Sequence, residues 1–416
     1  GEAVQADDHG GIQDLSYFKD STEYNERQLI PVNLPNARIL IKGGGVHLNQ
    51  LYHPYADSTL AKDSLGIGFY HDLYYQKDSY TYTDGGNVDG FYPAPLDIGE
   101  VKDSISIKKL VNSLGAKFSF KAIDFDTRIN HKYYETWQQK QDTFVSIWNP
   151  AVEATFDSGK NTIKLYGDMA FSASGNNQEW KLRANISRKF NQFAAHLKGG
   201  YVNAFPSVLQ SWYHSTYYSW DKQFDNTDLV YLAAEAEHPN IMGSVSFSNI
   251  TDYIYFSNAG EPEQNDESFQ LLQFNLEPKI EWNDITFKNI LKYQKVFGDD
   301  YLRLPEFMSK HELYYSFNLI QDVLKTQIGT QLTFHSSFTG HKYIPATQAF
   351  VLQNDQQLGN YPYLDVFANF KIKRARIFVR YSHLNALLGN KRYFLMPSYP
   401  MRDDSFQFGI SWMFYD

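Results

Sequence analysis

Apolar and polar residues alternate along the segment from Asp404 to Asp416. The apolar positions, most of them aromatic, are Phe406, Phe408, Ile410, Trp412 and Phe414, and the positions between them are Ser405, Gln407, Gly409 and Ser411. A period of two residues is that of a β-strand, whose side chains point alternately to opposite faces of a sheet. An aromatic face opposite a small polar face is typical of a sheet with lipid on one side and a lumen on the other. The segment therefore predicts a transmembrane β-barrel.

The composition agrees with strands that are apolar on one face only. Aromatic residues make up 17% of the 416 residues, while hydrophobic residues reach 43% and the mean hydropathy is −0.48. No apolar run approaches the roughly 18 residues that a membrane-spanning helix requires. This excludes a helical membrane protein and leaves an array of soluble β-sandwiches as the main alternative to a barrel.

The number of cysteines and the net charge exclude several classes of function. The number of Cys is 0, which excludes disulfide scaffolds, cysteine zinc sites and catalytic thiols. The formal net charge is −9, whereas proteins that bind nucleic acid concentrate positive charge. We therefore expect no nucleic-acid partner.

The lengths of the connections between the alternating segments also favour a barrel. Short links, such as 283–284 and 321–322, alternate with long ones, such as 206–226 and 337–361. Bacterial outer-membrane barrels carry short turns on the periplasmic side and long loops outside. We predict an all-β fold, a single closed antiparallel transmembrane barrel of about 16 strands, within a range of about 14 to 18.

The barrel is expected to comprise residues 37–416. Residues 1–36 are polar and weakly patterned, so we expect an N-terminal extension that acts as a plug, a tail or a periplasmic segment. The stretch 76–103 is rich in Asp, Gly, Tyr and Pro, residue types that predict a large loop.

Charged residues on the face opposite the aromatic residues should point into the lumen, because a Lys or Arg facing lipid at mid-depth costs about 2–4 kcal/mol. The main candidates are Lys164, Asp168, Lys181, Arg183, Glu277, Lys279, Lys288, Lys292, Lys371 and Arg380. They could form the wall of a wet channel whose field selects solutes. They could equally form an ion-paired network that braces a narrow lumen, and the sequence favours neither.

The sequence gives little support to metal binding or catalysis. A Gly-rich segment offers oxygen ligands at Asp84, Asn87 and Asp89, a weak candidate for Ca²⁺ because the spacing does not match an EF-hand. Neither a metalloprotease motif on a helix nor a Gly-x-Ser-x-Gly elbow is present. We expect no enzyme activity, no cofactor and no bound metal.

Several stretches of the C-terminal half resemble the putative porin family of Bacteroidota outer membranes. They are the segment 240–255, which contains Asn249-Ile-Thr-Asp-Tyr-Ile-Tyr255, then Tyr301-Leu-Arg-Leu-Pro-Glu306, the segment 358–373 and the terminal segment 399–414. The resemblance covers about residues 150–416 and implies passage of solutes. It also implies that the terminal strand, with Phe408, Trp412 and Phe414, is the signal that barrel-assembly machinery recognises.

Together these features predict a porin-like barrel in the outer membrane of a Gram-negative cell, through which small solutes pass passively or by facilitated diffusion. The alternative is a non-conducting structural subunit of a larger outer-membrane complex, for secretion, barrel assembly or nutrient uptake. The expected partners are outer-membrane lipid and lipopolysaccharide, the barrel-assembly machinery during insertion, and other outer-membrane subunits.

Overall fold

A large antiparallel sheet dominates the computed structural model, which describes residues 9–15, 30–54, 66–85, 90–96, 101–139, 141–172, 178–388 and 393–413. The sheet has 17 strands, each paired with its neighbours along the chain. They are β1 (Arg38–Tyr52), β2 (Gly66–Asp84), β3 (Val101–Phe120), β4 (Ile123–Gln138), β5 (Gln141–Asp157), β6 (Asn161–Ser172), β7 (Gln178–Phe190), β8 (Phe193–Ala204), β11 (Thr227–His238), β12 (Ile241–Thr251), β15 (Phe269–Trp282), β16 (Ile285–Phe297), β17 (Phe307–Ile320), β18 (Leu324–His335), β21 (Tyr363–Ile372), β22 (Ala375–Ser382) and β25 (Ser405–Trp412).

Tight turns join the strands at one end of the sheet, which we call the short-turn end. Asn191, Asn283 and Lys373 occupy such turns with φ of 40°, 52° and 49°. Two-residue hairpins require this left-handed conformation, and Asn adopts it more readily than most residues. The other end, the long-loop end, carries the connections 205–226, 252–268, 336–362 and 383–404. The expected alternation of short and long connections is therefore present over most of the sheet. The connection 139–140 is a short one at the long-loop end, and 53–65, between β1 and β2, is a long one at the short-turn end.

The long loops contain secondary structure that the sequence pattern did not predict. Eight short strands lie within them: β9 (Trp212–His214), β10 (Ser219–Asp221), β13 (Ile254–Phe256), β14 (Pro262–Gln264), β19 (Lys342–Ile344), β20 (Ala349–Val351), β23 (Phe394–Met396) and β24 (Tyr399–Pro400). The short helices α2 (Val208–Ser211) and η3 (Leu384–Leu388) also belong to these loops. Neither is long and apolar enough to cross a membrane, nor is any other helix of the described chain.

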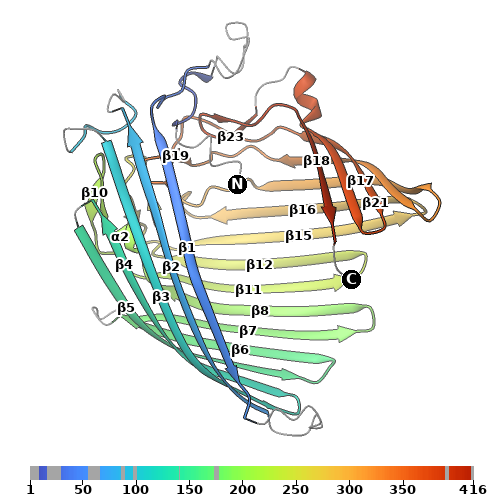
Figure 1. Cartoon of the computed structure of the whole chain (residues 1–416), viewed down its shortest axis with the longest axis horizontal. Coiled ribbons are helices and arrows are strands. Elements are labelled where there is room, and N and C mark those ends of the chain that lie inside the picture. Colours follow the sequence, from blue (N-terminus) through green and yellow to red (C-terminus); the bar gives the residue numbers. More distant parts are fainter. Residues whose placement is uncertain are drawn as a thin grey trace.

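The expected closed barrel of about 16 strands is not what the structure shows. The described chain has 25 strands, 17 of them in the large sheet, because the sequence count missed the short pairings inside the loops. The sheet curves strongly from β1 to the C-terminal strands (Figure 1). Among the described residues, however, no pairing joins β1 to β25. We call the space between these two unpaired edges the seam.

The strands on the N-terminal side of the sheet are longer than a membrane requires. β2 has 19 residues and β3 has 20, whereas about 9–11 residues suffice for a tilted membrane-spanning strand. The loop expected at 76–103 is therefore wrong in its first part, since β2 continues to Asp84. The residues Tyr80 and Tyr82 are buried there, because they alternate toward a packed core at the long-loop end.

That core is the largest cluster of buried side chains in the described chain, and it is rich in tyrosine. It contains Leu34, Ala37, Tyr80, Tyr82, Tyr92, Val101, Ile105, Tyr213, Tyr217, Tyr218, Trp220, Ile344, Ala346, Ala349 and Val351. Its members come from strand ends and from loops far apart in the chain. Burial of their apolar surface stabilises the folded loops.

The N-terminal segment also packs at the long-loop end, where β1 begins. The backbone N–H of Ile12 donates to the carbonyl of Ser398 at 2.9 Å. Ile12 and Ile30 are buried in a second cluster with Leu358, Tyr393 and Phe394. The described parts of residues 1–36 are thus in contact with the C-terminal loops, and their role as a plug, tail or periplasmic segment stays a prediction.

Candidate functional site

Apolar side chains occupy one face of the terminal strand and are exposed. Phe408 is 72% exposed and Trp412 is 59% exposed, so the aromatic face predicted from the sequence does not turn into a protein core. Phe414 lies outside the described residues. Recognition of this strand by assembly machinery stays a prediction.

The opposite face of the sheet carries the ten charged residues singled out from the sequence, and the structure does not bring them into one cluster. Four of them make ion pairs: Lys181 with Glu179, Lys279 with Glu281 at 2.7 Å, Lys288 with Glu312 at 3.7 Å, and Arg380 with Asp365 at 3.7 Å. The Arg183 guanidinium lies 5.6 Å from the centroid of the Tyr166 ring. Another four of the ten have no ion pair within the described chain: Lys164, Lys292, Lys371 and Glu277. Their assignment to a solute pathway stays a prediction.

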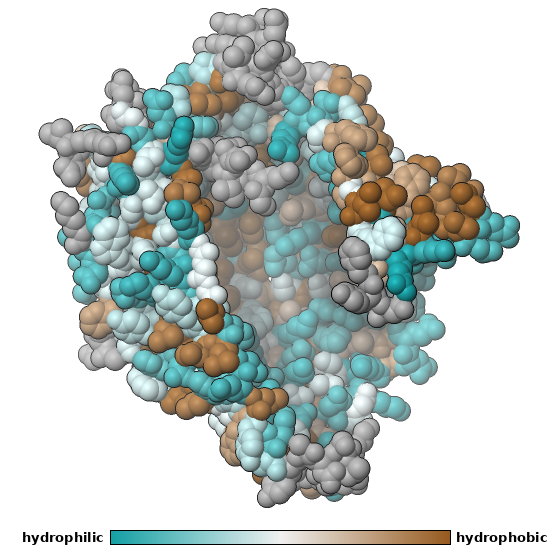
Figure 2. Space-filling view, viewed as in Figure 1, coloured by the Kyte–Doolittle hydropathy of each residue, from teal (hydrophilic) through white to brown (hydrophobic). Residues whose placement is uncertain are grey.

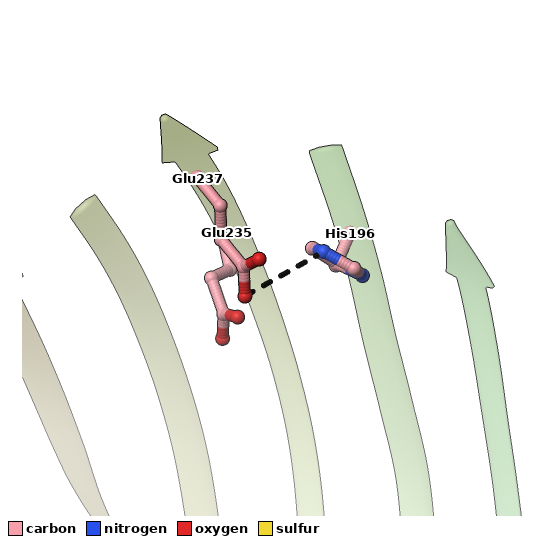
Figure 3. Close-up of side chains that lie close together, drawn as sticks. All are labelled: His196, Glu235 and Glu237. Carbon is pink, nitrogen blue, oxygen red and sulfur yellow. Dashed lines mark ion pairs between the residues drawn. The ribbon is translucent and has the colours of Figure 1, made fainter. Parts of the chain in front are cut away.

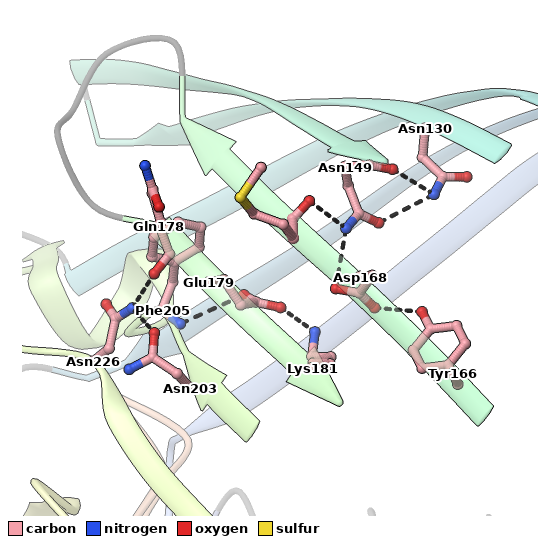
Figure 4. A network of polar contacts seen from close by, with 11 residues as sticks. Asn130, Asn149, Tyr166, Asp168, Gln178, Glu179, Lys181, Asn203, Phe205 and Asn226 are labelled. Atoms are coloured by element: carbon pink, nitrogen blue, oxygen red, sulfur yellow. Dashed lines mark hydrogen bonds and ion pairs between the residues drawn. The ribbon is translucent and has the colours of Figure 1, made fainter. Parts of the chain in front are cut away.

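Asp168 is the centre of a buried polar network on β4, β5 and β6 (Figure 4). The Asn130 amide donates to Oδ1 of Asn149 at 3.1 Å, and the Asn149 amide donates to Oδ1 of Asp168 at 3.1 Å. The Tyr166 hydroxyl donates to the other carboxylate oxygen. Buried amides need such partners, because an unpaired buried polar group costs about 1–3 kcal/mol. Asn130 and Asn149 are not among the residues predicted from the sequence, although both stand at polar positions of alternating strands.

A second cluster lies near the short-turn end of β8 and β11 (Figure 3). The ligand-type atoms of His196, Glu235 and Glu237 all lie within 4.8 Å of one another. One imidazole nitrogen and two carboxylates are donors that first-row divalent cations accept. The Lys198 ammonium, however, donates to Glu235 at 2.8 Å and neutralises that carboxylate. The group is therefore an ion-paired network in this structure, and we assign no metal to it.

Asp84 is the one weak calcium candidate among the described residues, and calcium binding there stays a prediction. Asp84 is buried, and its carboxylate accepts hydrogen bonds from the hydroxyls of Tyr82 at 2.8 Å and Tyr217 at 2.9 Å. Asn87 and Asp89 lie outside the described residues. Asp84 is thus part of the tyrosine-rich core.

Two loops meet over the long-loop end of the sheet. One is the connection 336–362, which contains β19 and β20, and the other is the β9–β10 hairpin within 205–226. We call these two loops the cap. The Tyr213 hydroxyl donates to the carbonyl of Ala346 at 2.9 Å. The Ala346 N–H donates to the hydroxyl of Tyr92 at 3.2 Å, and the Tyr80 hydroxyl donates to the carbonyl of Pro345. The connection 336–362 therefore reaches from β18 and β21 to groups on the β2 side of the molecule.

Burial disfavours the charged forms of several titratable groups in the cap. Burial raises the pKa of Tyr218 to about 12 and raises the pKa of Tyr217 above its ordinary value. It lowers the pKa of His341, and it lowers the pKa of Lys342. These shifts share one cause, the removal of the charged form from water. The cap is therefore a folded layer rather than a set of solvated loops.

The sheet surrounds a hollow that opens toward the viewer in Figure 2. Hydrophilic atoms line much of its visible wall, mixed with apolar ones. A hollow with polar walls, charged side chains on the strands and a folded cap at one end is suited to hold or pass hydrated solutes.

Comparison with solved structures shows the same kind of fold. The Copper transporter OprC superposes with a TM-score of 0.67 at 9% identity, over 91% of this chain and 66% of that protein. The siderophore receptor PirA from Acinetobacter baumannii gives 0.57 at 11% identity, over 88% of this chain and 62% of that protein. The ferric enterobactin receptor PfeA gives 0.53 at 10% identity, over 91% and 71%. The chain is thus shorter than these proteins and spans about two thirds of their length.

Sequence comparison adds the family. A search of curated proteins finds no relative. The sequence model of the family described as "Putative porin" matches residues 2–416, nearly the whole chain. This agrees with the resemblance recognised in the C-terminal half and extends it to the N-terminal strands. The chain therefore belongs to the putative porin family.

Proposed function

We propose that this protein is an outer-membrane pore that lets small solutes cross through a polar lumen. The observation that carries the proposal is the alternation along the strands of the large sheet. On β7, for example, Leu182 and Ile186 are exposed apolar residues, while the neighbouring Lys181 makes an ion pair. Such strands are stable where hydrocarbon lies on one side and water on the other. Family membership and the outer-membrane receptors that share the fold support the same location and a transport role.

We further propose that the sheet closes in the membrane. Lipid-exposed sheet edges do not occur in hydrocarbon, because their N–H and C=O groups would lack partners. Both seam strands, β1 and β25, run from the long-loop end to the short-turn end. Direct pairing across the seam would therefore be parallel, and antiparallel closure would need an odd number of additional strands.

The cap favours passage that is restricted at the outer mouth. The connection 336–362 reaches across the long-loop end to the large sheet, where the hydroxyl of Tyr80 on β2 donates to the carbonyl of Pro345. The same feature is the one observation that favours the second candidate function, a non-conducting structural subunit of a larger outer-membrane complex. In either role the proposed partners are lipid, lipopolysaccharide and the barrel-assembly machinery, and we propose no enzyme activity.

Conductance of the purified protein in planar bilayers tests the proposal. We expect discrete openings in the intact protein and larger ones after removal of residues 340–356, which form the centre of the cap. As a control, the substitutions Ser158→Ala and Lys160→Ala alter the β5–β6 turn at the short-turn end of the sheet, away from the cap. A protein that stays silent with and without residues 340–356, and that copurifies with fixed outer-membrane subunits, would favour the structural role.

A further inference from the structure

Three basic residues stand directly opposite one another near the short-turn end of β18, β21 and β22. Lys325 pairs in register with Lys371, and Lys371 pairs with Arg376. The same rung of the sheet continues to Asn318 on β17 and to Ser411 on β25. We call these three cations the basic row. Like charges directly opposite each other on neighbouring strands destabilise a sheet.

Ion pairs do not offset this charge within the described chain. None of the three cations has an ion pair there. Along β21 the next acid on the same face is Asp365, six positions from Lys371, a separation of about 20 Å at the rise of an extended strand. Asp365 itself pairs with Arg380. Lys288 and Arg380 on the same wall have carboxylate partners, whereas the three cations of the basic row face one another.

The basic row lines a cavity. The volume of this cavity is about 890 Å³, and its wall includes Lys325, Lys371 and Arg376 together with Asn318 and Ser411. Asp284, in the β15–β16 turn, is the one carboxylate on the wall. The cavity therefore has a surplus of two positive charges, from three cations and one acid. Gln327 and Asn369, one rung further in, add neutral hydrogen-bonding groups.

We propose that the basic row is a binding and selectivity site for small anionic solutes that carry a phosphate or carboxylate group. A guanidinium can bind such a group with two parallel hydrogen bonds, and two ammonium groups add charge-assisted bonds. A bound anion would also relieve the repulsion within the row. Cations on a pore wall raise the local concentration of anions and hinder cations. This inference rests on the proposed pore and names the class of solute that it would favour.

The test compares Lys371→Glu with the wild-type protein in planar bilayers under a KCl gradient. Reversing the charge of Lys371, in the middle of the basic row, replaces three like charges by alternating ones, so the variant should fold normally. We expect the chloride-to-potassium permeability ratio to fall by roughly thirtyfold at low salt, because Coulomb's law in water gives about sixfold for each ion, in opposite directions, for a change of two unit charges about 8 Å away. Lys160→Glu is the matched control, because Lys160 is exposed in the β5–β6 turn at the same end of the sheet. It should change the ratio much less.

The outcomes separate this inference from the proposed pore. An open pore whose permeability ratio is the same in the Lys371→Glu and wild-type proteins would overturn the anion site and leave the pore intact. A protein without conductance would overturn the proposed pore. Calorimetric titration with inorganic phosphate in maltoside micelles would then test whether the basic row binds anions. Binding that is lost in Lys371→Glu and kept in Lys160→Glu would support the site, and absence of binding would overturn it. If anionic lipid in the micelle abolishes phosphate binding, the row holds a lipid headgroup and the assignment to solutes fails.

Discussion

The hydroxyl of Tyr213 and the carbonyl of Ala346 are 2.9 Å apart, although the two residues are separated by 133 positions in the chain. Tyr213 belongs to the β9–β10 hairpin and stacks on Trp220, with 4.6 Å between the ring centroids. Ala346 lies at the tip of the connection between β18 and β21 and is 0% exposed. This bond links two loops that rise from different parts of the large sheet. It therefore identifies the contact on which the cap depends.

Replacement of Tyr213 by Phe should loosen the cap without unfolding the sheet. The change keeps the ring and removes the hydroxyl, so the buried carbonyl of Ala346 loses a partner at a cost of about 1 kcal/mol. We expect faster amide hydrogen exchange in residues 342–351 and unchanged exchange in β7. Tyr255→Phe is the control, because the Tyr255 hydroxyl donates to Glu263 at an exposed position. Equal effects of the two substitutions would contradict a special role for Tyr213.

Acid should weaken the cap through His341. Burial lowers the pKa of His341 below its ordinary value of 6.5, so folding favours the neutral imidazole. The stability that this contributes is fully present above pH 6.5 and is lost as the pH falls through the lowered pKa. Arg303 and Asp300 face the ring with opposite charges, and a ring nitrogen lies 3.2 Å from the carbonyl of Tyr301.

The measurement is limited proteolysis of the connection 336–362 between about pH 7.5 and about pH 5. Cleavage of the native protein should accelerate as the pH falls. His341→Gln removes the titrating imidazole and should flatten this pH dependence. Carboxylates elsewhere in the protein still titrate at about pH 5 in both proteins. If the variant and the native protein show the same pH profile, His341 does not control the cap.

Asn149→Ala should destabilise the sheet itself. Asn149 joins Asn130 to Asp168, so its removal leaves a buried amide and a buried carboxylate with fewer partners. We expect the free energy of unfolding to fall by about 1–3 kcal/mol, measured by urea denaturation in micelles. Asn185→Ala is the comparison, since Asn185 is half-buried and accepts one long bond of 3.4 Å from Ser187. Its effect should be well below that of Asn149→Ala.

Local patterns predicted much of the large sheet. The alternation around Phe408 and Trp412 identified a strand with an exposed aromatic face, and the turn at Asn283 lies where the short link was expected. Such features depend on neighbouring residues only. The composition of the stretch from Gln76 to Asp84 predicts a loop, yet the stretch continues β2, since Tyr80 and Tyr82 pack into the core of the long-loop end.

The parts that the sequence did not predict depend on contacts between distant segments. Tyr80 bonds to Pro345 across 265 positions, and no periodicity within either segment indicates that partner. The basic row is a similar case, because Lys371 was singled out as a charged residue but its register with Lys325 and Arg376 was not known. Registers between strands fix which charges stand side by side, and these follow from the whole sheet rather than from one strand.

The seam gives the last prediction. In a lipid bilayer, the amide protons on the unpaired edges of β1 and β25 should exchange as slowly as those of β7, which has a partner on each side. The reason is that an edge in hydrocarbon would leave its N–H groups without acceptors, at several kcal/mol each. Hydrogen exchange on the reconstituted protein measures this directly, with β7 as the internal standard. Rapid exchange of residues 42–50 in lipid, with β7 protected, would show that the seam stays open and would remove the closed barrel from the proposal.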